Sequence, residues 1–368
     1  MDFWEHYRRD FPVTHHWAYM NHAAVAPLSR RAAVAMQGQV EDAANHGAAH
    51  SRYWYETYEA VRLAAARLTG ATAEEIAIVK NTTEGLSFIA NGLDWRPGDA
   101  LVAVEGEFPA NYYPWENLRK RGVEIRRVPQ RQGRIELDDL DRACRGARLL
   151  AISWVQYLSG SRIDPEVVGE ICARHGCLFV LDAIQGLGVF PLDVRRARLH
   201  ALAADGHKWL CGPEGCGVLY VAADLLPQLD VAELGWTSVA RWRDYQSCDL
   251  TLRPGAARFE CGTLTTVACY GLAAAIELLL EVGIDRIGER VVEITRRIAC
   301  GVTGRGWELL TAPEAGIVAF RKEGVDAAET VQRLAAQGIA VAPRSGWVRA
   351  SPHFYVSEEE VDRLVGAC

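Results

Sequence analysis

The most constraining feature of the sequence is a regular alternation of short apolar runs and helical patterns between about residues 70 and 225. Helical patterns such as TEGLSFIANGL, NYYPWENLRKRG and DPEVVGEICARHG separate several of the runs. Continuous stretches of Val, Ile, Leu and Ala between helices are typical of strands buried on both faces of a mainly parallel sheet. The runs that we predict to be strands are EIAIVK, ALVAVE, VEIRRVP, RLLAISWV, CLFVLDA, ALAADG and GVLYVA.

The alternation ends near Gly255, where a long helical region over residues 266–300 precedes short strand and helix patterns. We therefore predict a large domain over residues 16–254 and a small α/β or α+β domain formed by residues 1–15 and 255–368. The chain has 368 residues, of which 49% are hydrophobic, and this is enough apolar material for one large and one small core.

Charge and hydropathy patterns argue against nucleic-acid and membrane partners. The net charge is −7, and the densest basic stretch, VRRAR at residues 194–198, is typical of a solvated face. The N-terminal MDFWEHYRRDFPV is charged and lacks the apolar core of a signal peptide. The most apolar helical stretch, GLAAAIELLLEVGI, contains Glu277 and Glu281. These observations predict a cytoplasmic protein.

The ten cysteines lie between Cys144 and Cys368 without a CxxC pair, which is typical of reduced, mostly buried thiols. Cys172, His175 and Cys177 have a spacing that resembles a metal site. They straddle a predicted helix end and strand start, so we predict no metal site there.

Polar residues at the carboxyl ends of the predicted strands are candidate site residues, because open parallel sheets bind ligands beyond those ends. Asn81, Thr82 and Thr83 follow the strand that ends near Lys80 and precede a helix. Free backbone N–H groups and hydroxyls at a helix start can bind a phosphate, and a simple helix cap is the alternative. Gly262 and Thr263, in RFECGTLTT, offer a second contact of this kind, again with helix capping as the alternative.

Two further strand ends carry charged side chains. Asp182 ends the run CLFVLDA and is followed by Gln185. A buried carboxylate needs a partner, such as a protonated ring nitrogen of a ligand, although it could instead cap a helix. Lys208 lies in DGHKWLCGPEGCG after the next run, with Asp205 and His207 beside it. Neighbouring strand ends could direct these side chains at one ligand.

In combination, these residues resemble the class V aminotransferases, a family of fold-type I pyridoxal-phosphate enzymes that includes cysteine desulfurases and isopenicillin N epimerase-like proteins. The resemblance runs from YMNHAAVAPLS (residues 19–29) to RASPHFYVSEEEVDRL (residues 349–364). It implies a three-layer α/β fold with a mainly parallel sheet in the large domain. It also implies pyridoxal 5′-phosphate as cofactor, an amino-acid substrate and a homodimer.

The resemblance also assigns roles to individual residues. Lys208 resembles the lysine that forms the imine with the cofactor, Asp182 the carboxylate that pairs with the pyridine nitrogen, and Arg349 the arginine that grips the substrate carboxylate. His22 and Gln156 are predicted to line the substrate pocket, with a structural hydrogen bond as the alternative for each. The remaining cofactor contacts that it implies are Thr82, Thr83, Phe108, Gln185, Asp205, His207 and, from the neighbouring subunit, Thr263.

One departure from the family bears on the reaction. Desulfurases carry a nucleophilic cysteine on a loop before the arginine, but IAVAPRSGWVRAS has none, and no cysteine occurs between Cys300 and Cys368. We therefore predict an aminotransferase that acts through an aldimine and a quinonoid. A lyase or epimerase of the same family and a catalytically silent scaffold are alternatives. A nucleotide-binding protein is a further alternative, but the first strand–helix turn lacks GxGxxG and GxxxxGK[ST].

Overall fold

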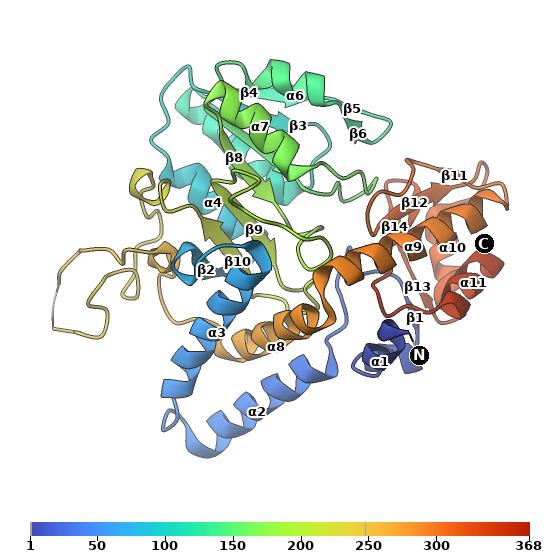
Figure 1. Ribbon diagram of the computed structural model, residues 1–368, viewed down its shortest axis with the longest axis horizontal. Coiled ribbons are helices and arrows are strands. Elements are labelled where there is room, and N and C mark those ends of the chain that lie inside the picture. Colours follow the sequence, from blue (N-terminus) through green and yellow to red (C-terminus); the bar gives the residue numbers. More distant parts are fainter. Residues whose placement is uncertain (1, 247) are drawn as a thin grey trace.

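The computed structural model describes residues 2–246 and 248–368, and a seven-stranded sheet forms its centre (Figure 1). All of the predicted runs form strands of this sheet. In it, β10 pairs antiparallel with both neighbours and the other pairs are parallel, so the predicted mainly parallel sheet is confirmed. In spatial order the strands are β2 (Ile76–Val79), β10 (Gly217–Val221), β9 (Ala201–Asp205), β8 (Leu178–Asp182), β7 (Leu149–Ser153), β3 (Ala100–Val104) and β4 (Glu124–Val128).

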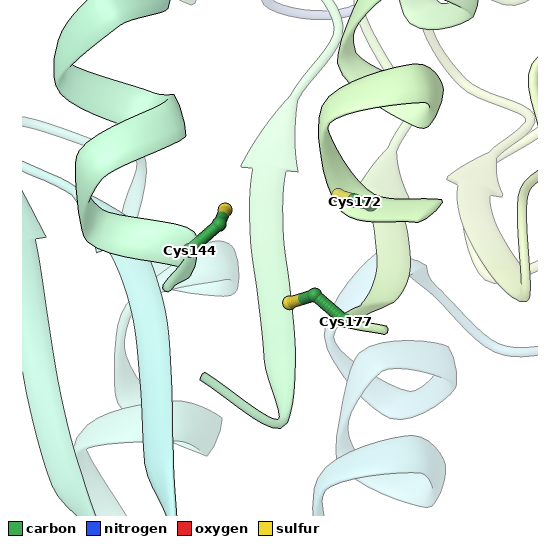
Figure 2. Close-up of side chains that lie close together, drawn as sticks. All are labelled: Cys144, Cys172 and Cys177. Carbon is green, nitrogen blue, oxygen red and sulfur yellow. The ribbon is translucent and has the colours of Figure 1, made fainter. Parts of the chain in front are cut away.

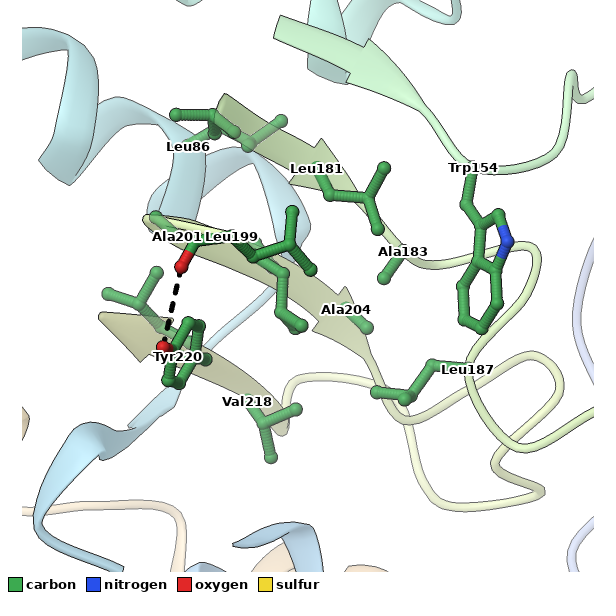
Figure 3. Packing of buried hydrophobic residues seen from close by; sticks show 14 of the residues in the cluster. Leu86, Trp154, Leu181, Ala183, Leu187, Leu199, Ala201, Ala204, Val218 and Tyr220 are labelled. Carbon is green, nitrogen blue, oxygen red and sulfur yellow. Dashed lines mark hydrogen bonds between the residues drawn. The ribbon is translucent and has the colours of Figure 1, made fainter. Parts of the chain in front are cut away.

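The central strands are buried because helices and loops cover both of their faces. Every residue of β3, β7, β9 and β10 is buried, which explains why these runs are continuously apolar rather than alternating. Figure 3 shows part of this core, where Leu181, Ala204 and Val218 come from three adjacent strands. The hydroxyl of Tyr220 donates a hydrogen bond to the carbonyl of Leu199 at 3.4 Å, so even this polar atom has a partner (Figure 3).

Two groups of helices pack near opposite edges of the sheet (Figure 1). The helices α6 and α7 lie side by side and contact β4, β3 and β8, whereas α2, α3 and α8 pack together and α3 contacts β2. The helix α4 packs on β9 and β10. The bounds of these helices are α2 (Arg30–His46), α3 (Arg52–Thr69), α4 (Thr82–Gly92), α5 (Tyr113–Glu116), α6 (Leu137–Cys144), α7 (Pro165–His175) and α8 (Thr266–Val282).

The second sheet is antiparallel and belongs to the C-terminal part of the chain, with both chain ends nearby (Figure 1). A separate hydrophobic cluster lies under it and includes Ala18 and Met20 from the N-terminal part. The elements of this region are β1 (Ala18–Tyr19), which pairs with β13 (Ile339–Ala340), β11 (Glu308–Leu309), β12 (Val318–Arg321), β14 (Ala342–Arg344), β15 (Trp347–Ala350), α1 (Phe3–Arg8), α9 (Ile284–Thr303), α10 (Ala327–Ala335) and α11 (Glu358–Ala367).

The domain division of residues 16–254 against 1–15 and 255–368 stays a prediction, and residue 1 lies outside the described residues. The remaining short elements of the described residues are the hairpin of β5 (Gln130–Arg131) with β6 (Arg134–Ile135) and six 3₁₀ turns, namely Pro12–His15, Ala73–Glu75, Pro109–Asn111, Asn117–Arg121, Leu226–Gln228 and Ala256–Phe259.

The predicted helical region over residues 266–300 is two helices, because Gly283 interrupts it with a φ of +94° that favours glycine. The pair α8 and α9 reaches the length and composition of a membrane span only when taken together, and the two helices are bent by 82°. Within the described part of the chain, no single helix is both long and apolar enough to cross a membrane.

Candidate active site

A cavity of about 260 Å³ lies at the carboxyl edge of the large sheet, where β2, β3, β7, β8 and β9 all end. It brings together nine of the candidate residues from the sequence, namely Asn81, Thr82, Thr83, Phe108, Gln185, Asp205, His207, Lys208 and Arg349. The other lining residues are Ala23, Ala24, Val25, Ala110, Tyr157, Ile184 and Arg344. A larger cavity of about 530 Å³ lies elsewhere and holds Thr263.

Lys208 is the buried amine of this cavity. It follows β9 in a turn and is only 7% exposed, and its Nζ lies 5.2 Å from the ring centre of Phe108. Burial lowers the pKa of Lys208 to about 8, with the carboxylates of Asp182 and Asp205 opposing this shift and Arg349 adding to it. A nucleophilic lysine needs the neutral amine, and a lowered pKa supplies more of it near neutral pH.

This pKa predicts the pH dependence of covalent cofactor uptake by cofactor-free protein. Since the neutral amine attacks an aldehyde, the uptake rate should rise about tenfold between pH 6 and pH 7 and level off above about pH 8. Stopped-flow absorbance with pyridoxal phosphate over pH 6–10 measures it. A rate that still rises tenfold per unit between pH 8.5 and pH 9.5 would indicate an ordinary lysine and contradict the burial argument.

The start of α4 forms an anion-binding edge of the cavity. The Asn81 side chain caps the helix by accepting a hydrogen bond from the Glu84 N–H at 2.9 Å, so the bond that Thr82 and Thr83 offer is not needed for capping. The Thr82 hydroxyl oxygen accepts a bond from the backbone N–H of Asp205 at 3.0 Å, which leaves its own O–H free to donate. Free N–H groups, hydroxyls and the helix dipole together suit a phosphate.

Asp205 and His207 lie on the other side of this edge. Nδ1 of His207 is 3.0 Å from Oδ2 of Asp205. A carboxylate can only accept hydrogen bonds, so Asp205 suits a phosphate poorly as a direct contact. When the imidazole of His207 is protonated, Asp205 can pair with its Nδ1, and Nε2–H is then the donor that a phosphate requires.

Asp182 is a buried carboxylate at the end of β8. Its Oδ1 accepts a bond from the Ile184 N–H at 3.1 Å, and no side-chain cation forms an ion pair with it among the described residues. Burial raises the pKa of Asp182 to about 7, and the nearby carboxylate of Glu107 adds to this shift. A protonated ring nitrogen would supply the missing positive partner, so this position fits the predicted cofactor.

Arg349 gives the cavity a buried cation with an open hydrogen-bonding edge. It is 1% exposed, and its Nη1 donates to the carbonyl of Tyr157 at 2.7 Å. Its Nε and Nη2 are buried and find no hydrogen-bond partner within the described residues. Burial lowers the pKa of Arg349 to about 10, with Arg344 adding to the shift. Nε and Nη2 form the side of a guanidinium that binds a carboxylate with two parallel hydrogen bonds.

Gln185 lines the cavity, but its amide is already bonded at both ends. Nε2 donates to the carbonyl of Ala23 at 3.1 Å, and Oε1 accepts from the Trp209 indole at 2.6 Å. These bonds fix the orientation of the amide, and the second hydrogen of Nε2 remains for a ligand oxygen.

Four of the predicted site residues lie outside the lining of this cavity, namely Asp182, His22, Gln156 and Thr263. His22 is fully buried, and its ring nitrogens are 3.0 Å from the Ser351 carbonyl and 2.6 Å from the Tyr355 hydroxyl. Burial lowers the pKa of His22 well below its ordinary value. Its position corresponds to the alternative of a structural hydrogen bond.

Gln156 is also buried behind the lining. Its Nε2 donates to Glu107 at 3.1 Å, and its Oε1 accepts from Gln130 at 2.9 Å. Glu107, which was not predicted, accepts further bonds from the backbone and hydroxyl of Ser153.

Thr263 lines the larger cavity instead of the cavity that holds Lys208. Its predicted role is in the site of a neighbouring subunit, and such a role does not require it to lie near Lys208 of its own chain.

Sequence reasoning missed Tyr157 and Arg344 as lining residues. Tyr157 packs edge-on against Phe108, with ring centres 5.4 Å apart, and Arg344 lies on β14 directly before the turn to β15. The sequence does carry a signal for Tyr157, because this residue follows the carboxyl end of β7. The rule that ligands bind beyond such ends also identified Asp182 and Lys208.

The turn before Arg349 has only two residues. Arg344 pairs with Trp347 across the hairpin of β14 and β15, and the intervening Ser345 and Gly346 have φ values of +49° and +81°. Positive φ at both positions is typical of a tight hairpin turn. No cysteine lies among the described residues that line the cavity.

Comparison with known proteins gives one consistent result. The family model described as Aminotransferase class-V matches residues 18–364. A probable cysteine desulfurase of Methanothermobacter thermautotrophicus is 30% identical over 390 residues, covering 98% of this chain and 96% of that protein. An uncharacterized aminotransferase of Bacillus subtilis, YcbU, is 28% identical with the same coverage. The apo structure of a cysteine desulfurase from Thermococcus onnurineus NA1 superposes with a TM-score of 0.90 at 27% identity, covering 100% of this chain and 97% of that one.

Proposed function

The chain belongs to the class V aminotransferase family, and on that basis we propose that it binds pyridoxal 5′-phosphate at Lys208 and transfers the amino group of an amino acid. Pyridoxal phosphate is the cofactor of this family, and the three-layer fold-type I architecture predicted from the sequence is confirmed. The observation that carries the proposal is the presence of a buried lysine and a buried arginine with an open edge in one cavity.

The first group of site residues is proposed to bind the cofactor. In this proposal Thr82, Thr83 and His207 bind the phosphate, and Asp182, at the carboxyl end of β8, holds a proton on the ring nitrogen. When bound, the cofactor supplies the electron-withdrawing ring that stabilises negative charge at the substrate α-carbon. The ring of Phe108 covers Lys208 and helps to exclude water.

Lys208 and Arg349 act on the substrate. Arg349 binds the α-carboxylate through Nε and Nη2 and thereby fixes the orientation of the α-carbon. Once its amine is free, Lys208 can accept a proton from that carbon and return it at another atom. The lowered pKa of the Lys208 ammonium suits this exchange near neutral pH.

Amino-group transfer is proposed over desulfuration because the cavity offers no protein thiol to receive sulfur. No cysteine lines it in the described structure, and the two-residue turn before Arg349 leaves no room for a cysteine-bearing loop. A lyase or an epimerase of the same family also needs no thiol and is the second candidate.

The products separate these reactions. We would incubate the holoenzyme with each common amino acid, with and without a 2-oxo acid as acceptor. Transamination gives a new amino acid only when the acceptor is present. A lyase gives products without the acceptor, and an epimerase changes only the optical rotation. Sulfide released from cysteine at a catalytic rate would contradict the proposal.

We also infer that the protein is a homodimer, with Thr263 completing the site of its neighbour. The larger cavity holds Thr263 beside Trp236 and Trp242, and Tyr245 and Leu250 near it in sequence are exposed. Exposed aromatic and aliphatic side chains of this kind are typical of an interface. Light scattering measures the mass directly, and a monomer that is fully active at the assay concentration would contradict the inference.

The Asp182→Asn variant tests the role of that carboxylate. We expect it to keep covalently bound cofactor but to lose about 10²- to 10³-fold in kcat, since a preorganised charge beside the reacting group is removed. The visible spectrum of the bound cofactor should change, while the cofactor content stays the same. Absorbance spectra and steady-state kinetics of the purified variant measure the two effects. A variant with wild-type kcat would show that Asp182 does not act on the cofactor.

A further inference from the structure

We propose that Cys144, Cys172 and Cys177 form a site for a thiophilic metal ion of the Zn(II) or Cu(I) class, separate from the active site. Their Sγ atoms all lie within 4.8 Å of one another, and all three side chains are buried (Figure 2). The cysteines come from three elements, since Cys144 ends α6, Cys172 lies on α7 and Cys177 directly precedes β8.

The spacing suits a metal with little rearrangement. Zinc–thiolate bonds are about 2.3 Å long, so a tetrahedral set of ligands places its sulfurs about 3.8 Å apart. Since the sulfurs already lie within 4.8 Å of one another, each pair has to approach by at most about 1 Å to reach this spacing. Soft thiolate ligands favour Cu(I) and Zn(II) over hard cations such as Mg²⁺. Each thiol that binds the metal releases its proton to solvent.

Two helix ends at the cluster favour a cation, and side-chain bonds join the two helices. The carboxyl ends of α6 and α7 both lie at the cluster, and their dipoles attract positive charge. Asp141 on α6 joins the two helices through its bonds to Arg174 at 2.5 Å and His175 at 3.1 Å. The helices that carry Cys144 and Cys172 are therefore fixed before any metal arrives.

The cluster borders a cavity on one side, and a cationic side chain lies beside it. A cavity of about 400 Å³ is lined by Gly176, Cys177 and His200, so one of the three thiol-bearing residues borders it. Arg126 donates hydrogen bonds to the carbonyls of Ala143 at 3.1 Å and Arg145 at 2.8 Å, beside Cys144. A guanidinium there would offset the negative charge of a metal bound by three thiolates.

The site is distinct from the catalytic cavity. Cys177 lies at the amino end of β8, whereas Asp182 lies at its carboxyl end, about 17 Å along the strand at about 3.3 Å per residue. An ion there would stabilise the packing of α6 and α7 against the sheet and would take no part in the reaction at Lys208.

Cobalt(II) is the probe for the first test, because its bonds to thiolate give a near-ultraviolet charge-transfer band that nitrogen and oxygen ligands lack. Reduced, tag-free holoenzyme is titrated under anaerobic conditions. We expect saturation of the band at one equivalent per chain. The partly exposed group of Asp42, His46 and His50 can also take Co²⁺, but it would give no such band. Absence of the band in the wild type would overturn the proposal.

Cys144→Ala and Cys172→Ala are the variants, and Cys269→Ala is the matched control. Cys269 is also buried, with its sulfur 3.8 Å from that of Cys216, but it lies away from the cluster on α8. The two variants should lose the band and bind metal at least about 100-fold more weakly, while the control keeps both. A band that survives in both variants would overturn the proposal.

Two further measurements keep the test decisive. If the variants fail to fold, as judged by circular dichroism and cofactor content, Zn²⁺ should still protect these three cysteines of the wild type from alkylation, as mapped by mass spectrometry. Equal alkylation with and without Zn²⁺ would overturn the proposal.

Competition experiments then identify the preferred ion: the protein competes with a zinc indicator for Zn²⁺ and with a Cu(I) chelator for Cu(I). If the protein takes neither ion at micromolar concentration, the proposal is also overturned.

Discussion

The Lys208→Ala variant is expected to lose covalently bound cofactor and at least about 10³-fold in kcat. The sequence has four lysines, and Lys80, Lys120 and Lys322 are exposed, whereas Lys208 is buried in the cavity. Removal of its amine therefore leaves no other lysine in the lining to bond to the cofactor or to move the α-proton. Cofactor content after borohydride treatment and kcat with the best amino-acid substrate measure the two losses.

Lys80→Ala is the matched control for this experiment. Lys80 also follows a strand at the carboxyl edge of the sheet, but its side chain is 65% exposed and pairs with Glu84 at 2.6 Å. We expect this variant to keep its cofactor and its activity. Borohydride-stable cofactor in the Lys208→Ala protein would place the covalent link elsewhere and contradict the assignment.

The Arg349→Lys variant is expected to lower kcat/KM for amino acids by about 10²- to 10³-fold without changing cofactor content. Loss of a buried, hydrogen-bonded charge partner costs about 2–5 kcal/mol, and lysine cannot reproduce the two parallel bonds of the guanidinium. The effect should fall mainly on KM, because the carboxylate is bound in the ground state as well as in the transition state. Steady-state kinetics of the purified variant measure this split.

Arg344→Lys provides the comparison, since Arg344 lines the same cavity but is exposed and its Nη1 is bonded to the Pro343 carbonyl. A loss of less than about tenfold is expected for it, in keeping with a screened surface charge. Amines that lack a carboxylate give a second comparison. If Arg349→Lys slowed their turnover as much as that of amino acids, Arg349 would serve the structure rather than the carboxylate.

Much of the large sheet could be predicted from the sequence, because strands buried on both faces are continuously apolar and their carboxyl ends share one edge. That rule located Asp182, Lys208 and the start of α4 before any contact was known. The break at Gly283 was missed, since a single glycine in a long helical pattern is often tolerated.

The parts that could not be predicted depend on packing between distant segments. His22 and Gln156 lie near strand ends like the lining residues, but burial behind the cavity wall distinguishes them, and sequence does not show burial of a polar side chain. Cys144 joins Cys172 and Cys177 only because α6 packs against α7, which the spacing of the cysteines does not reveal. The cytoplasmic location stays a prediction.

The most direct test of the central claim is to reduce the wild-type protein with borohydride in the presence of pyridoxal phosphate and map the label by peptide mass spectrometry. We predict one cofactor per chain, attached to Lys208 in the peptide that contains DGHKWLCGPEGCG, with loss of the visible absorption band on reduction. Label spread over Lys80, Lys120 and Lys322, or no label on folded protein, would contradict the assignment of this cavity as the active site.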